Sequence, residues 1–150
     1  MRNNLTDALK TAMKKKDGIA VSTLRLILAA LKDREIAARA RGVAEGITDD
    51  EILSLLQSMI KQRKESIEAY KKGGRMELVE QEVAEIAVIE TFLPQQMSAE
   101  EIAEAVADVI TELEATTLKN MGKVMHALKE RFPGAMDFSK ASILVKDKLN

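Results

Sequence analysis

The chain has 150 residues, of which 46% are hydrophobic, 31% charged and only 3% aromatic, and its formal net charge is −1. Strong helix formers such as Ala, Leu, Glu, Lys, Met and Ile dominate it, so the composition predicts an all-α protein. The absence of cysteine excludes disulfides, thiol nucleophiles and thiolate metal sites, and the near-zero net charge argues against a strongly basic nucleic-acid binder.

Helical periodicity runs through the first 94 residues. Apolar residues at helical spacing predict helices over residues 5–16, 19–41, 48–72 and 76–93. The segments between them carry the expected helix breakers, which are Asp17-Gly18, a loop from Gly42 to Gly46, Gly73-Gly74 and Pro94. Thr48 and Glu51 form a capping-box pattern at the start of the third helix. We expect Met13 in the first helix and Val83 in the fourth to face the core.

Three shorter helices follow a boundary at Leu93–Ser98. Ser98 and Glu101 form a second capping-box pattern, which opens a helix whose apolar stripe runs from Ile102 to Leu113. The next helix, over residues 118–131, has Thr116 or Thr117 as its cap and ends before Pro133-Gly134, and Asp137 caps the last helix. We therefore predict two domains, a helical bundle over residues 1–94 and a three-helix domain over residues 98–150.

The N-terminal 18 residues alternate polar and apolar side chains and lack the continuous apolar core of a signal peptide. No run of residues approaches the ~18 apolar positions that a membrane span needs. Together with the lack of cysteine, these features lead us to expect a cytoplasmic protein that has no membrane partner.

Charge is segregated along the chain. Residues 98–114 carry six acids and no base, residues 115–150 carry seven bases and three acids, and residues 61–75 carry six bases and two acids. The near-neutral total therefore hides two basic segments, each with a charge of +4. Either they are ordinary solvated helix faces or they bind an anionic partner.

Patterns that carry catalysis are missing. There is no phosphate-binding glycine loop, no His-Glu-x-x-His zinc pattern and no glycine-flanked nucleophilic serine, and the chain has a single histidine. We therefore expect no catalytic residue, no cofactor and no metal site. Two glutamate pairs at helical spacing resemble an acid–base dyad, but we expect both on solvent-facing surfaces, namely Glu82 with Glu85 and Glu101 with Glu104.

One helix face of the C-terminal segment is unusual. Lys119, Gly122, Lys123 and His126 follow the i, i+3, i+4, i+7 rule and lie opposite the apolar residues of the same segment. A glycine inside a helix costs roughly 1 kcal/mol relative to alanine. Two interpretations stay open. The glycine either lets a phosphate backbone approach between two lysines, or it packs against a neighbouring helix while the lysines are merely solvated.

Two long blocks resemble the GatB/YqeY family, whose members are similar to the C-terminal tail of the B subunit of glutamine-dependent tRNA amidotransferase. They are KQRKESIEAYKKGGRMELVEQEVAEIAVIETFLPQQMSAEEI (61–102) and NMGKVMHALKERFPGAMDFSKASILVKDKL (120–149). The resemblance implies an all-helical protein of two parts with tRNA as its partner, and it also allows an aminoacyl-tRNA synthetase or an amidotransferase subunit as a partner. Carried over by position, it makes Lys61, Arg63 and Lys64, together with the Met121-Gly122-Lys123 turn, the candidate RNA contacts.

Small departures from the family pattern are Phe92, where tyrosine is expected, and Asn120, where aspartate is expected. Members of the family are often described as carbon–nitrogen ligases that use glutamine as amide donor, but this chain shows no residues for that chemistry. Three hypotheses about function follow. The chain is an accessory tRNA-binding module, a helical adaptor that docks on a protein, or a free-standing amidotransferase-type enzyme.

Overall fold

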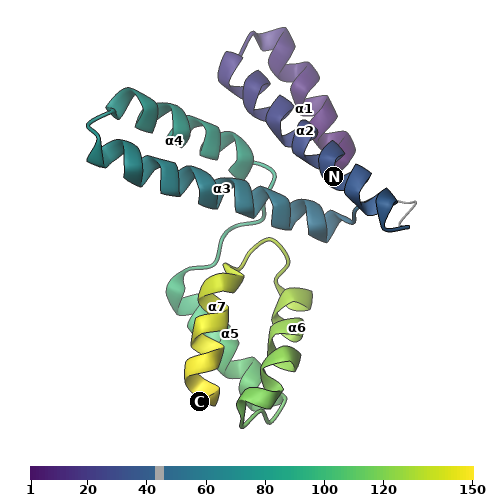
Figure 1. The fold of residues 1–150 in the computed structure, drawn as a ribbon, viewed down its shortest axis with the longest axis vertical. Coiled ribbons are helices and arrows are strands. Elements are labelled where there is room, and N and C mark those ends of the chain that lie inside the picture. The colour runs from purple at the N-terminus through teal and green to yellow at the C-terminus, as the bar shows by residue number, and fades with distance from the viewer. Residues whose placement is uncertain (43–45) are drawn as a thin grey trace. The chain divides into compact units, whose positions relative to one another are not determined.

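The computed structural model describes residues 1–42 and 46–150. Within these residues the chain forms seven α-helices and one short 3-10 turn, without any strand, which confirms the all-α prediction (Figure 1). The elements are α1 (Arg2–Lys15), α2 (Gly18–Ala40), α3 (Asp49–Lys72), α4 (Met76–Glu90), α5 (Ala99–Glu112), η1 (Leu118–Asn120), α6 (Met121–Arg131) and α7 (Phe138–Leu149). Residues 43–45 of the predicted loop lie outside the described residues. Over those same ranges, no helix combines the length and apolarity that crossing a bilayer requires.

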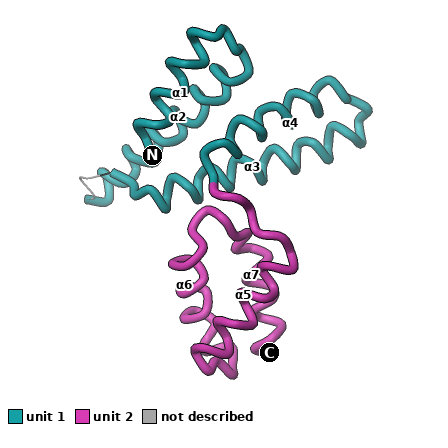
Figure 2. Tube along the Cα trace, turned by 180° about the vertical axis from the view of Figure 1, so that it is seen from behind, with its two compact units in different colours: residues 1–93 teal, residues 94–150 magenta. Residues whose placement is uncertain are grey.

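The chain divides into two compact units, Met1–Leu93 and Pro94–Asn150 (Figure 2). Each unit has its own cluster of buried aliphatic side chains. The division falls between Leu93 and Pro94, whereas the predicted domains are residues 1–94 and 98–150. The last residues before it are not helical, because α4 ends at Glu90, three residues earlier than predicted.

Unit 1 consists of two helical hairpins, α1 with α2 and α3 with α4 (Figure 1). The first turn is very short, because Lys16 adopts a left-handed conformation and Asp17 Oδ1 accepts a hydrogen bond from the Ala20 amide at 3.1 Å. The second turn depends on Gly74, whose φ of +70° favours glycine. These two turns set the helices antiparallel and bring their apolar faces together.

Leu5, Ile27, Leu56 and Ile89 are among the fully buried residues of the unit 1 core. Two of the residues expected in this core are instead at the surface, since Met13 is 50% exposed and Val83 is 53% exposed. Met13 lies at the edge of the α1 stripe, in the last turn. In α4 the buried face is rotated away from Val83 and includes a glutamate, so the prediction for Val83 is wrong for a reason described below.

Unit 2 is a three-helix arrangement that begins with the predicted capping box. Ser98 Oγ accepts from the Glu101 amide and Glu101 Oε1 accepts from the Ser98 amide, both at 3.1 Å. Asp137 caps α7, as predicted, by accepting from the Ser139 and Lys140 amides. The core is built from Ile102, Val106, Val109, Val124, Leu128, Met136, Ala141, Val145 and Leu149. Leu113, the predicted end of the α5 stripe, is 41% exposed.

Candidate nucleic-acid interface

The start of α6 is shaped by a side chain that folds back on the preceding turn. Asn120 Oδ1 accepts hydrogen bonds from the Thr116 amide at 3.2 Å and the Thr117 amide at 3.3 Å. The 3-10 turn η1 then runs directly into α6, so residues 118–131 form one helical segment. An aspartate at position 120 would make the same bonds, which explains how asparagine replaces it without cost to the turn.

Gly122 lies in this segment on an exposed surface. A Cβ built on Gly122 meets no other atom of the described residues within 4 Å, apart from its chain neighbours and the nearby backbone of its own helix. Gly122 therefore does not pack against a neighbouring helix, so that part of the second interpretation is wrong, while lysines that are exposed fit both interpretations. Nor does a positive φ require glycine here. The missing side chain leaves a patch of bare backbone facing solvent.

Two free lysines flank the bare backbone. Lys119 and Lys123 are exposed, and neither forms an ion pair with any described residue. His126 continues the same face one turn later, where its Nε2 lies 3.0 Å from Glu130 Oε1. Both of those side chains are more than two thirds exposed. The face thus offers two exposed cations beside an uncovered helix surface, and Glu130 lies beside His126 at its far end. We call Lys119, Gly122, Lys123 and His126 the α6 face.

The basic block of α3 divides into two kinds of residue. Lys61 and Lys64 are exposed and, within the described part of the chain, free of ion pairs. Arg63 is different, because its side chain is only 12% exposed. The two lysines remain candidates for binding an anion, whereas Arg63 is mostly buried and its Nε is shielded from solvent. The α3 block and the α6 face belong to different units.

Arg63 joins α3 to α4. Its Nε lies 3.3 Å from Glu85 Oε2 and 4.0 Å from Glu82 Oε2, and its Nη1 donates to the Met59 carbonyl at 3.2 Å. The Glu85 side chain is 10% exposed and that of Glu82 is 18% exposed. The expectation that this glutamate pair faces solvent is therefore wrong. The two acids occupy the inner face of α4, and Val83 is displaced to the outside for that reason.

The pKa of Glu82 is raised above its usual range. Burial is the main cause, the neighbouring Glu85 carboxylate adds to it, and the positive charge of Arg63 opposes both. A carboxyl whose pKa is higher in the folded than in the unfolded chain binds its proton more readily when folded. It therefore adds to stability as the pH falls through the raised pKa, and at neutral pH its ionised form lowers the stability.

We expect Glu82→Gln to raise the free energy of unfolding at pH 7 by about 0.5 kcal/mol, because an amide avoids the cost of burying a charge. The gain should shrink as the pH falls from 7 toward 4, where the wild-type carboxyl takes up a proton. Thermal melts of both proteins across that range measure the difference. Glu80→Gln, at an exposed position of α4, is the matched control and should show no such trend. A Glu82→Gln variant less stable at pH 7 would contradict the expectation.

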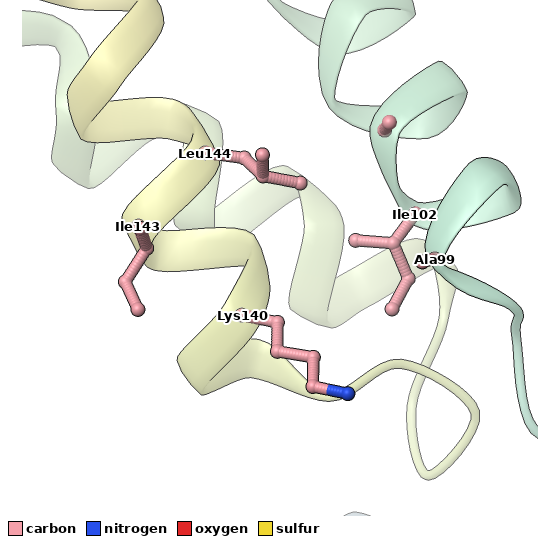
Figure 3. A pocket seen from close by; sticks show the side chains of 6 residues that line it. Ala99, Ile102, Lys140, Ile143 and Leu144 are labelled. Carbon is pink, nitrogen blue, oxygen red and sulfur yellow. The ribbon is translucent and has the colours of Figure 1, made fainter.

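A shallow apolar groove of about 310 Å³ lies between α5 and α7 in unit 2 (Figure 3). Ala99, Ile102 and Ala103 line one side, and Lys140, Ile143 and Leu144 line the other. The lining holds no carboxylate, imidazole or hydroxyl group. Nor do three histidine or carboxylate side chains cluster anywhere in residues 1–42 and 46–150 in a way that could hold a metal ion. The groove offers apolar contact and the single amine of Lys140, which has no second polar side chain of the lining beside it.

Comparison with known proteins gives a consistent set of relatives. A family model described as "Yqey-like protein" matches residues 2–149. "Altered inheritance of mitochondria protein 41, mitochondrial" of Lachancea thermotolerans is 38% identical over 112 residues, which cover 73% of this chain and 58% of that protein. The protein of the same name from Kluyveromyces lactis is 34% identical over the same shares, and that from Eremothecium gossypii is 32% identical over 75% of this chain and 61% of its own. The chain thus spans about three fifths of the length of these relatives.

These relatives correct the predicted location. The lack of cysteine and of an apolar signal core predicted a cytoplasmic protein, but these relatives, which match most of the chain, are named as mitochondrial. The expectation was wrong because its arguments do not distinguish the two compartments. A chain without cysteine suits any reducing compartment, and mitochondrial targeting segments are amphipathic rather than continuously apolar, so the lack of an apolar signal core carries no weight against them.

Proposed function

The chain belongs to the YqeY-like protein family, and from this premise we propose that it is an accessory RNA-binding module with tRNA as its partner. The supporting observation is the α6 face, where two free lysines flank a helix surface that no side chain covers. Lysines neutralise phosphates, and bare backbone allows the sugar–phosphate chain to approach closely. In such a complex the shape of the folded RNA decides recognition, because the face presents few groups that read base edges.

The electrostatic part of the proposal has a direct test. Fluorescence anisotropy of labelled bulk tRNA, titrated with the full chain at several salt concentrations, should give an affinity that falls steeply as salt rises. Each lysine that neutralises a phosphate contributes about 0.7–0.9 to the slope of log affinity against log salt. Binding that is indifferent to salt, or the absence of binding at about 50 mM salt, would remove the proposal.

The bare backbone has its own test. We expect Gly122→Ala to raise the free energy of unfolding by about 0.5–1 kcal/mol, because alanine favours the helix and its methyl group meets open space. The same methyl group should weaken tRNA binding about threefold, and the larger Gly122→Gln about tenfold or more, by holding the phosphates away. Thermal melts and the anisotropy titration measure the two effects.

Gly18→Ala is the matched control for that substitution. Gly18 also lies in a helix, has no positive φ and leaves open space where a Cβ would be, but it belongs to α2. It should leave tRNA affinity unchanged. If Gly122→Ala and Gly122→Gln bind tRNA as the wild type does, the glycine has no part in RNA contact and the proposal loses its carrying observation.

A second candidate function is a helical adaptor that docks on a synthetase or an amidotransferase subunit. The observation in its favour is the outer face of α4, where Met76 and Val83, seven residues apart, are each 53% exposed. A pull-down with the purified B subunit of an amidotransferase distinguishes the two. If the chain is an adaptor, the B subunit is still retained after nuclease treatment. Met76→Ala then abolishes that retention, whereas Lys123→Ala leaves it unchanged.

A further inference from the structure

Helix α2 carries an apolar stripe on its outer surface that the described fold does not cover. Ile19, Leu26 and Ile36 are 42%, 50% and 55% exposed, respectively. They lie on the side of α2 opposite the buried Leu24, Ile27 and Leu31. Ala29 and Ala37 are also exposed and widen the stripe at helical spacing. Large exposed aliphatic residues that follow one helix face indicate a contact surface rather than scattered surface residues.

The stripe also holds two charged groups without partners. Asp33 lies along its centre and Arg25 along its edge, and neither forms an ion pair with any described residue. An aspartate in the middle of an apolar contact must find a cation there, because burying an unpaired carboxylate is costly. The occupant of the stripe should therefore bring a base to Asp33 and an acid to Arg25.

A second copy of α2 meets both requirements when it runs antiparallel. If the two-fold axis passes between residues 27 and 28, Leu26 of one copy faces the small Ala29 of the other, and Ile19 lies level with Ile36. Arg25 is then level with residue 30 of the other copy. Asp33 of that copy lies three residues further on, about 4.5 Å along the helix axis. That is within reach of an arginine side chain, and the two-fold symmetry makes the pair twice.

A parallel pair lacks this complementarity. It would place Arg25 beside Arg25 and Asp33 beside Asp33, so that like charges would oppose each other within the contact. We therefore propose that α2 is a homodimer interface in which two copies of the chain pack antiparallel through Ile19, Leu26 and Ile36, with reciprocal Arg25–Asp33 ion pairs at the centre.

The stripe from Ile19 to Ala37 is about 27 Å long, which makes the contact a modest one. Interfaces of this size are at the lower end of those that form stable complexes, so we expect a dissociation constant of about 1–50 µM. Sedimentation equilibrium of the full chain from about 5 to 200 µM should show a reversible monomer–dimer equilibrium. A chain that remains monomeric throughout this range overturns the proposal. Binding of anionic phospholipid vesicles through the same stripe would not rescue it.

Charge exchange tests the proposed register. Asp33→Arg places two arginines together in each half of the dimer, and Arg25→Asp places two aspartates together, so each variant alone should dissociate at least tenfold more readily. An equimolar mixture of the two should recover dimers, because both contacts in the mixed pair join opposite charges. The double variant should recover them as well.

Two further variants separate the interface from general effects. Leu26→Glu should abolish dimers, whereas Val83→Glu, at an equally exposed position of α4, should leave them unchanged. Circular dichroism melts confirm that each variant is folded. If the single charge variants dissociate but their mixture does not recover, the antiparallel register is wrong and the proposal falls.

Discussion

Replacing Arg63 by alanine is expected to lower the free energy of unfolding by about 3 kcal/mol, near the lower end of the cost of removing one partner from a buried ion pair. The reason is that Glu85 and Glu82 would remain on the inner face of α4, mostly shielded from water, without the cation that lies 3.3 Å from the first and 4.0 Å from the second. Thermal and urea unfolding of the full chain, followed by circular dichroism, measure the loss.

Lys64→Ala is the matched control, since Lys64 follows Arg63 on α3 and is exposed. It should change stability by less than about 0.5 kcal/mol. The double variant Arg63→Met with Glu85→Leu should recover part of the stability, because apolar residues replace the closer pair while Glu82 stays without its cation. An Arg63→Ala protein that melts like the wild type and binds tRNA more weakly would show that Arg63 is an RNA contact after all.

Much of the fold follows from local patterns in the sequence. The caps formed by Ser98 and Asp137 appear as predicted, because each depends on a side chain and a backbone amide only a few residues apart. Helix α4 shows where such reasoning fails. Its burial depends on what α3 presents to it, so an arginine on α3 turns Glu85 inward and Val83 outward. No pattern within α4 alone contains that information.

In the candidate site, too, local features could be predicted and features that depend on tertiary packing could not. The spacing of Lys119, Gly122 and Lys123 was enough to place them on one face, since a helix fixes its own geometry. Whether Gly122 packed against another helix depended on tertiary structure, and only the open space around it decided the question. Charge counting grouped Arg63 with its two neighbouring lysines, although its acidic partners lie some twenty residues away. The pair Glu82 and Glu85 on α4 is the sequence signal that could have separated Arg63 from the two lysines.

The exposed stripe of α2 was also missed, for a related reason. Apolar periodicity over residues 19–41 predicts a helix with a buried face, and Leu24, Ile27 and Leu31 form that face. Ile19, Leu26 and Ile36 lie on the other side of the same helix. The described fold packs α1 and α4 against the side that holds Leu24, Ile27 and Leu31, and it leaves the other apolar side exposed.

Reversing both charges of the α6 face, with Lys119→Glu and Lys123→Glu together, is expected to weaken tRNA binding by tenfold to a hundredfold at about 100 mM salt. Two attractive contacts would become repulsive, and the slope of log affinity against log salt should fall in magnitude by about 1.4–1.8. Stability should hardly change, because both side chains are exposed and neither takes part in an ion pair with any described residue. The anisotropy titration at four salt concentrations measures both quantities.

Lys146→Glu with Lys148→Glu alters the net charge by the same amount, in the same unit, on the exposed surface of α7. If RNA is held by the α6 face, this control should lose less than threefold in affinity and keep most of its salt slope. Equal losses in the two variants would mean that RNA responds only to overall charge. The bare backbone at Gly122 would then have no role in binding, and the adaptor function would become the better account of the chain.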